Sequence, residues 1–206
     1  METLAQGKPS PVDLEYPLLV LNLEPALHMT EDQFFELCQI NRDLRIERNA
    51  FGELIIMPPA GGETGKRNAE IAIQLGVWAK RDGEGTTFDS STGFRLPNGA
   101  VRSPDAAWVR HARWEGLTPE ERKKFIPLCP DFTVELRSPT DRLSDMEEKM
   151  REYLDNGAQL GWLIAPEQRR VYVYRPQAPV QQVKKPETVS GDPVLAGFVL
   201  DLREVW

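Results

Sequence analysis

Histidine and cysteine are scarce in this chain of 206 residues, and each scarcity removes a class of chemistry. The two histidines, His28 and His111, lie in unrelated segments, so they offer little to a zinc hydrolase or a histidine-based nuclease. A Ser/His/Asp triad is equally poorly supported. The two cysteines, Cys38 and Cys129, form no CxxC pair. We expect each of them to be a reduced, structural thiol.

Long apolar runs and targeting signals are also lacking. The longest apolar runs, such as residues 18–21, are far too short to cross a bilayer. The N-terminal METLAQGKPSPVD has neither the basic start nor the apolar core of a signal peptide. We therefore expect a cytoplasmic protein that does not enter a membrane. No glycine-rich phosphate loop is present, which argues against the P-loop nucleotide hydrolases.

An excess of positive charge is missing as well. Lysine and arginine number 25 against 32 acidic residues, which gives a formal net charge of −7. This balance argues against a protein that coats DNA by neutralising phosphates. It does not exclude an enzyme that meets nucleic acid locally, because acidic metal ligands lower the total. The remaining composition, 40% hydrophobic and 28% charged, is ordinary for one soluble globular domain.

The first half of the chain contains signals for two helices and a hairpin. Thr30 and Gln33 have capping-box spacing, so a helix is expected to begin at residue 30. Residues 44–47 and 53–57 read as a hairpin, and a second helix is expected over residues 64–81. The proline-spotted residues 1–29 are interpreted as a loosely packed extension, and residues 30–206 as a single domain.

The second half mixes strands with one further helix. The expected strands cover residues 86–89, 93–96, 105–109, 131–137, 160–164 and 171–174. A helix over residues 144–155 lies between two of them, and Ser144 and Glu147 again have capping-box spacing. This order predicts an α/β or α+β fold with a mixed sheet flanked by helices.

Two carboxylates stand out within this pattern. Asp105 follows Ser103-Pro104 at the mouth of an apolar strand, and Glu135 lies in the next strong strand, PDFTVELR. If these strands are neighbours, both acids can converge on one ion. Hard oxygen ligands of this kind suit Mg²⁺ or Mn²⁺, which can activate water beside a phosphodiester.

Lys149 lies on the helix that follows. The apolar stripe of that helix is centred near Met150, and Lys149 is roughly 85° from that centre by the 100°-per-residue rule. Its stem can therefore run along the sheet while its ammonium reaches the two carboxylates. Such a cation could position the attacking water and offset charge on a phosphate.

Each of these residues has a simpler interpretation when taken alone. Asp105 after a proline can merely close a turn, and Glu135 can face solvent. Lys149 can be a surface residue paired with Asp145 at i−4. The order of the three residues along the chain favours the functional interpretation: an acid at a strand start, an acid in the next strand, then a helical lysine.

Four segments of the chain resemble the Uma-type endonuclease family, a domain long labelled as being of unknown function. They are MPPAGGETGKRN, FDSSTGFRLPNGAVRSPDAAWV, PDFTVELRSPTDRLSDMEEKMREYLDNGAQLGWLIAP and VLAGFVLDL. The resemblance covers about residues 30–202, and it implies a PD-(D/E)xK restriction-endonuclease-like core with an N-terminal helix-hairpin extension.

The resemblance also implies roles for individual residues. Asp105 corresponds to the PD aspartate and Glu135 to the second metal-binding acid. The lysine of the ExK motif falls at Arg137, which is a departure, because arginine binds phosphate but does not exchange protons near neutral pH. The lysine of this family looks relocated to Lys149. Two weaker candidates come from the first core helix: Glu70 as an added acid and Asn68 as a polar neighbour.

Two functions follow as hypotheses. The first is a Mg²⁺- or Mn²⁺-dependent endonuclease that hydrolyses DNA, with Asp105 and Glu135 as ligands and Lys149 as the charge-stabilising residue. The alternative is a catalytically inactive binding or assembly module, which Arg137 and the acidic net charge favour. A homodimer is also expected, because the apolar residues 194–199 and Trp206 exceed what one edge strand needs.

Overall fold

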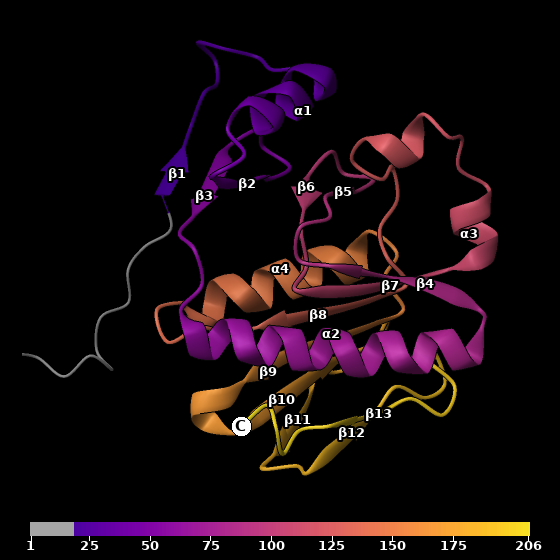
Figure 1. Ribbon diagram of the computed structural model, residues 1–206. Coiled ribbons are helices and arrows are strands. Elements are labelled where there is room, and N and C mark those ends of the chain that lie inside the picture. The colour runs from indigo at the N-terminus through magenta and orange to yellow at the C-terminus, as the bar shows by residue number, and fades with distance from the viewer. Residues whose placement is uncertain (1–18) are drawn as a thin grey trace, which may run out of the picture.

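A six-stranded sheet forms the centre of the protein, whose computed structural model describes residues 19–206 (Figure 1). Its strands lie in the order β11-β10-β9-β8-β7-β4. Along the chain they are β4 (Gly85–Asp89), β7 (Ala106–Arg110), β8 (Phe132–Leu136), β9 (Leu160–Ala165), β10 (Arg170–Tyr174) and β11 (Gln181–Lys184). Strands β8 and β9 are parallel, and the other neighbouring pairs are antiparallel.

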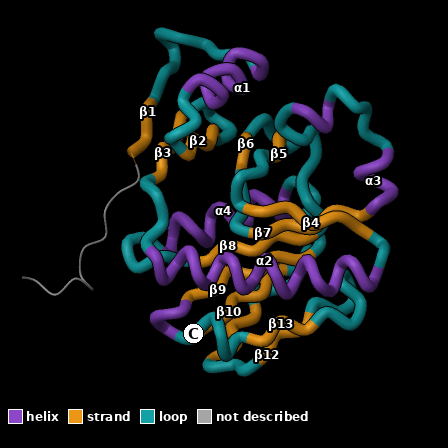
Figure 2. The backbone as a smooth tube through the Cα atoms, in the orientation of Figure 1, coloured by secondary structure: helices purple, strands orange, loops and turns teal. Residues whose placement is uncertain are grey.

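Long helices cover the two faces of this sheet (Figure 2). Helix α4 (Leu143–Asp155) makes the crossover that the parallel pair β8 and β9 requires, and it packs on both strands. Helix α2 (Gly62–Asp82) packs on β4 and β7 from the other side. The sheet is thus buried on both faces, which gives each side of β8 a helix to contact.

Strand β8 sends its alternate side chains to these two helices. Phe132, Val134 and Leu136 join the core that contains residues of α2. Glu135 points to the opposite face, because side chains alternate along a strand. Its partner on β9 is Leu163, which packs in the core that contains residues of α4. Glu135 therefore does not meet open solvent: helix α4 covers it.

The N-terminal layer consists of helix α1 (Glu31–Ile40) and a five-stranded sheet ordered β1-β3-β2-β6-β5. The strands are β1 (Leu19–Leu21), β2 (Arg45–Arg48), β3 (Leu54–Met57), β5 (Phe94–Arg95) and β6 (Val101–Arg102). Phe34, Leu54 and Val101 form its small core. The layer contains the predicted helix-hairpin extension, and the capping box of Thr30 and Gln33 is confirmed.

The C-terminal residues fold back over helix α2. Strands β12 (Thr188–Ser190) and β13 (Val199–Asp201) pair with each other, and the Trp78 indole of α2 donates to the Ala196 carbonyl. Leu195 and Phe198 are buried in the same core as α2. Two residues of the apolar stretch that suggested a homodimer thus pack within the chain, whereas Val199 is 52% exposed. Three short helices complete the fold of residues 19–206: α3 (His111–Glu115), η2 (Glu121–Lys123) and η3 (Pro166–Gln168).

Two details differ from the sequence predictions or extend them. Helix α4 begins at Leu143 after Arg142, so the predicted capping box of Ser144 and Glu147 is wrong; Ser144 lies inside the helix and its hydroxyl donates to Asp145. Residues 1–18 of the predicted extension lie outside the described part, whereas β1 pairs with β3. The domain boundary after residue 29 stays a prediction. Within residues 19–206, no helix is long and apolar enough to cross a membrane.

Candidate active site

Asp105, directly before strand β7, lies opposite Glu135 of the neighbouring strand β8. Strands β7 and β8 are antiparallel with Ala106 opposite Val134, so the next pair in this register is Asp105 and Glu135. The Leu136 amide donates to Asp105 Oδ2 at 2.9 Å, which fixes this carboxylate beside Glu135. The Asp105 and Glu135 side chains, 11% and 3% exposed, are called the acid pair below.

Lys149 reaches the acid pair from helix α4. Its ammonium lies 2.9 Å from Glu135 Oε1 and 2.9 Å from Glu47 Oε1. The predicted flank position on the buried side of the helix is therefore what brings it here, and the alternative pairing with Asp145 is not what the structure shows. Tyr153, one turn further along α4, donates its hydroxyl to Glu135 Oε1 at 2.8 Å.

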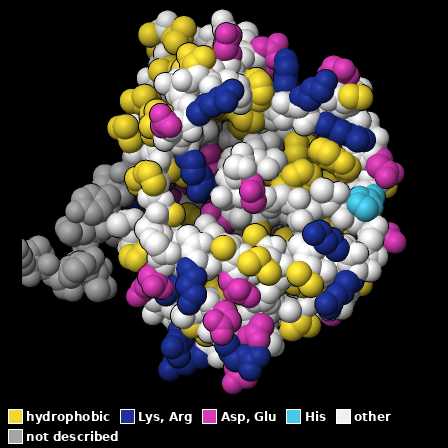
Figure 3. Space-filling model, viewed as in Figure 1, with side chains coloured by type: hydrophobic (Ala, Val, Ile, Leu, Met, Phe, Trp, Pro, Cys, Tyr) yellow, Lys and Arg dark blue, Asp and Glu magenta, His cyan; other side chains and the backbone are white. Residues whose placement is uncertain are grey.

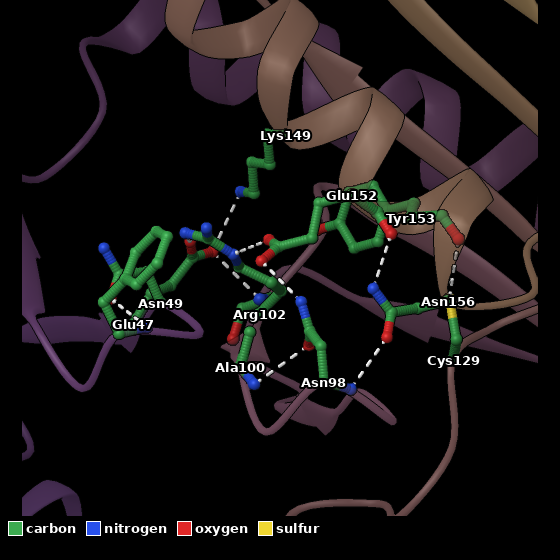
Figure 4. A network of polar contacts seen from close by, with 12 residues as sticks. Glu47, Asn49, Asn98, Ala100, Arg102, Cys129, Lys149, Glu152, Tyr153 and Asn156 are labelled. Carbon is green, nitrogen blue, oxygen red and sulfur yellow. Dashed lines mark hydrogen bonds and ion pairs between the residues drawn. The ribbon is translucent and has the colours of Figure 1, made fainter.

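Lys149 also begins a chain of alternating charges that sequence reasoning missed (Figure 4). Arg102 Nη1 lies 3.1 Å from Glu47 Oε2, and Arg102 Nε lies 2.5 Å from Glu152 Oε2. Lys149, Glu47, Arg102 and Glu152 are called the ion-pair chain below. Helical spacing from Lys149 could have found Tyr153, but no pattern in the strand RIER marks Glu47 as buried.

Asp105 has two further polar neighbours, Asn68 and Arg45. Asn68 Nδ2 donates to Asp105 Oδ1 at 3.1 Å, so Asn68 lies beside this acid. Arg45 Nη1 lies 3.9 Å from the same oxygen, and Arg45 Nη2 donates to the Ser103 carbonyl at 3.3 Å. Within the described residues, Asn68 Oδ1 and Arg45 Nε are buried without a hydrogen-bond partner.

The other two candidates make different contacts. Glu70 accepts a hydrogen bond from Gln74, whose amide also bonds to the backbone of Asp201 in β13. Arg137 Nε donates to the Asp141 carbonyl at 2.9 Å, so this guanidinium stabilises the loop after β8. Neither contact joins these residues to the acid pair, and their functional roles stay predictions.

The acid pair is held in a state that disfavours its negative charge. Burial raises the pKa of Glu135 to about 7, and the charges of Asp105 and Glu47 add to this effect against the opposing attraction of Lys149. Burial likewise raises the pKa of Asp105, against its hydrogen bond from the Leu136 amide. Two adjacent carboxylates with raised pKa values attract a cation or a proton.

The ion-pair chain shows the opposite balance. Burial acts to raise the pKa of Glu47, but the charges of Lys149 and Arg102 outweigh it and leave the pKa lowered. Burial acts to lower the pKa of Lys149, but Glu135 and Glu47 outweigh it and leave the pKa raised. Both groups are thus held in their charged forms.

The donor set at the acid pair fits a small divalent cation. Within residues 19–206 both contacts of the Glu135 carboxylate go to Oε1, so Oε2 is available as a ligand. Asn68 Oδ1 is a further oxygen without a partner in the described residues. Among the described residues, no group of three or more Asp, Glu, His or Cys side chains is arranged so that it could hold a metal ion. Mg²⁺ commonly needs only one or two carboxylates, with water and substrate phosphate completing its shell.

Comparison with known proteins agrees with this geometry. The profile of the Uma2 family, described as "Putative restriction endonuclease", matches residues 31–203. The chain belongs to this family. Comparison with curated proteins gave no match.

A solved structure, "a putative nuclease belonging to DUF820 from Anabaena variabilis ATCC 29413", has the same fold as the Uma2 chain, with a TM-score of 0.71. Its sequence is 22% identical over 86% of this chain and 97% of that chain. The predicted restriction-endonuclease-like fold and the predicted family are both confirmed, and family membership supports a nuclease function.

Proposed function

We propose that this Uma2 protein is a Mg²⁺- or Mn²⁺-dependent endonuclease that hydrolyses phosphodiester bonds of DNA. The observation that carries the proposal is the acid pair: two largely buried carboxylates, one directly before β7 and one in β8, with an ammonium 2.9 Å from one of them. The two carboxylates together would carry two negative charges, which one divalent ion would balance. The family and its endonuclease description support the same reaction class.

Each residue of the site has a distinct role in this reaction. Asp105 and Glu135 would hold the ion, which when bound supplies positive charge and lowers the pKa of water. Lys149 offsets the charge that develops on the phosphate, because its ammonium is fixed and shielded from solvent.

Arg45 is more exposed than the acid pair and Lys149, which indicates the side from which substrate would enter. Its side chain is 37% exposed, against 12% for Lys149. A partly exposed guanidinium fits a phosphate oxygen. We assign Arg45 to the phosphate that approaches Asp105. Arg137 is a second candidate for backbone phosphates.

The alternative function is a binding or assembly module that keeps the fold without turnover. Two observations favour it: Arg137 stands at the ExK position, and acidic and basic side chains are interspersed on the face in Figure 3. A DNA-binding surface of the usual kind would show an extended basic stripe.

The location in the cytoplasm stays a prediction.

A cleavage assay separates the two functions. Supercoiled plasmid and single-stranded DNA are incubated with wild type and with Asp105→Asn, each with Mg²⁺, Mn²⁺ or EDTA. The endonuclease proposal expects nicked or linear products from wild type with a divalent ion and none from the variant. Equal products from both proteins would assign the activity to a contaminant, and no product from a folded, metal-loaded wild type would favour the module.

The homodimer stays a prediction as well, but its original reason is weakened. Leu195 and Phe198 are buried beside helix α2, although Val199 is 52% exposed. Many other exposed large apolar side chains belong to the N-terminal layer and its connections: Leu19, Val20, Leu21, Leu27, Ile40, Leu44 and Phe51. Less apolar surface is thus left for a dimer at residues 194–199 than the sequence suggested. The mass from light scattering at tens of micromolar protein decides between monomer and dimer.

A further inference from the structure

One ammonium contacts two carboxylates in this site, and the two carboxylates have different roles. Lys149 Nζ lies at 2.9 Å from both Glu47 and Glu135. In the proposed function Glu135 binds a divalent ion, and that ion repels the ammonium from the same carboxylate. Lys149 therefore needs a second partner if it is to stay near the reacting phosphate.

We propose that Glu47, from strand β2 of the N-terminal layer, is the positioning residue that keeps Lys149 in the site when Glu135 binds the ion. This inference rests on the proposed function, because it concerns the ion-bound state of Glu135. It adds a role for a residue outside the acid pair and the helix.

Glu47 is built to act as a fixed anchor. Its Oε1 accepts from the Ser103 amide at 2.9 Å as well as from Lys149, and its Oε2 accepts from Arg102 at 3.1 Å. Arg102 is itself held by Glu152 of α4. Both oxygens are thus occupied by donors, so Glu47 holds a cation but has little capacity left for a metal ion.

The charges of the two groups support this division. The ion-pair chain contains two cations and two anions, so it is balanced when Lys149 stays with Glu47. The acid pair contains two anions, which a divalent ion balances. If Lys149 moved away from Glu47, the buried Glu47 carboxylate would lose one of its two cations. Such a loss is costly in a low-dielectric site.

The inference also gives the N-terminal hairpin a part in the site. Glu47 and Arg45 lie two residues apart on β2, so their side chains project from the same face of the strand. One contacts Lys149 and the other approaches Asp105. The hairpin would thus supply the anchor for one cation and contribute another.

A double-mutant cycle on Mn²⁺ affinity tests the inference. The proteins are wild type, Glu47→Gln, Lys149→Met and the double variant, titrated by calorimetry, with Glu148→Gln as the matched control on exposed helix surface. Without its anchor, Lys149 stays on Glu135 and competes with the ion, so Glu47→Gln should weaken Mn²⁺ binding roughly tenfold. In the Lys149→Met background the same substitution should have an effect below about threefold.

The opposite pattern would overturn the inference. If Glu47 acts only through its negative charge, its removal should weaken Mn²⁺ binding equally or more when Lys149 is absent. Glu47→Asp keeps the charge and shortens the side chain, so full recovery of affinity in Glu47→Asp would also contradict a positioning role. Circular dichroism of each variant confirms that it is folded.

A second readout keeps the inference testable if wild type binds no Mn²⁺, a result that contradicts the proposed function. The Lys149 ammonium is observed by ¹⁵N NMR of lysine-labelled protein and assigned by its loss in Lys149→Met. Because Glu135 also holds the ammonium in the metal-free protein, the comparison is made in the Glu135→Gln background. The ammonium should exchange slowly in wild type and in Glu135→Gln, where Glu47 still holds it, and its signal should be lost in the double variant Glu47→Gln/Glu135→Gln. A signal already lost in Glu135→Gln would show that Glu47 does not hold Lys149 by itself.

Discussion

Glu47 and Glu135 are equally buried and contact the same ammonium, yet their environments shift their pKa values in opposite directions. Each side chain is 3% exposed and lies 2.9 Å from Lys149. The pKa of Glu47 is lowered, because Arg102 and Lys149 outweigh burial, whereas burial and the nearby acids raise the pKa of Glu135 to about 7. Burial alone therefore does not mark a reactive carboxylate.

The difference lies in how each carboxylate is balanced. Glu47 has two cations and a backbone amide, while Glu135 shares one cation and faces a second acid. A balanced buried carboxylate stabilises structure, and an unbalanced one is available to bind a cation. The predictions below test whether this division between the ion-pair chain and the acid pair is correct.

The largest expected effect concerns Lys149, which joins the two groups. Lys149→Ala should lower the cleavage rate by about 10²–10³-fold, because one preorganised charge at the phosphate is lost. Mn²⁺ should still bind. Lys149→Arg should not restore full activity, since a forked guanidinium differs in size and geometry.

Arg137→Ala provides the contrast in the same single-turnover assay. It should weaken substrate binding more than the chemical step if Arg137 binds a backbone phosphate. Reversed effects of the two substitutions would place the functional cation at Arg137.

Thermal melts of the metal-free protein should distinguish the two glutamates, because their substitutions should change Tm in opposite directions. A raised pKa means that the stability contributed by Glu135 is complete below its ordinary value of 4.5 and is lost as pH rises through about 7. Glu135→Gln should therefore raise Tm by a few degrees near pH 8 and change it little near pH 5.

Glu47→Gln should do the reverse, because its lowered pKa gives stability that is present at neutral pH and lost on acidification. Near pH 8 the variant should lose about 3 kcal/mol, or roughly 6–12 °C in a chain of this size. A large destabilisation in Glu135→Gln as well would mean that both glutamates are structural.

Arg45→Ala should weaken DNA binding by about tenfold and reduce the slope of log affinity against log salt by about one, as expected for one phosphate contact. Arg42→Ala is the matched control, because Arg42 lies three residues before it and is exposed. Fluorescence anisotropy at several salt concentrations measures both. A fall in kcat with an unchanged salt slope would show that Arg45 acts only through Asp105.

The smallest effect is a pH dependence that identifies the ligand. Because the pKa of Glu135 is about 7, Mn²⁺ must displace its proton at lower pH. Affinity should fall by up to about tenfold for each pH unit below that value and level off above it. A midpoint well below pH 7 would point to Glu47, whose pKa is lowered.

Local patterns in the sequence predicted much of the fold. The alternation of β8, the stripe of α2 and the cap at Thr30 are set by neighbours in the chain, so they can be read before the fold is known. Ser144 shows the limit of such spacing: Arg142 precedes the helix, and no side chain caps it there.

The acid pair and Lys149 could be predicted because Asp105 directly precedes strand β7, Glu135 lies in β8, and Lys149 lies in α4, the element that follows β8. Glu47 and Arg45 could not, since they reach the site from another sheet and contact partners 55 or more residues later in the chain: Arg102, Ser103 and Lys149. Nothing local distinguishes a buried strand glutamate from a solvated one. Long-range contacts of this kind follow only from the packing of the two sheets.

The most direct measurement is Mn²⁺ calorimetry of Asp105→Asn and Glu135→Gln beside Glu47→Gln, all at a pH near 8. The account predicts that either acid-pair substitution abolishes measurable binding, while Glu47→Gln binds more weakly but still at one site. Undiminished binding in both acid-pair variants, or binding lost only in Glu47→Gln, would contradict it.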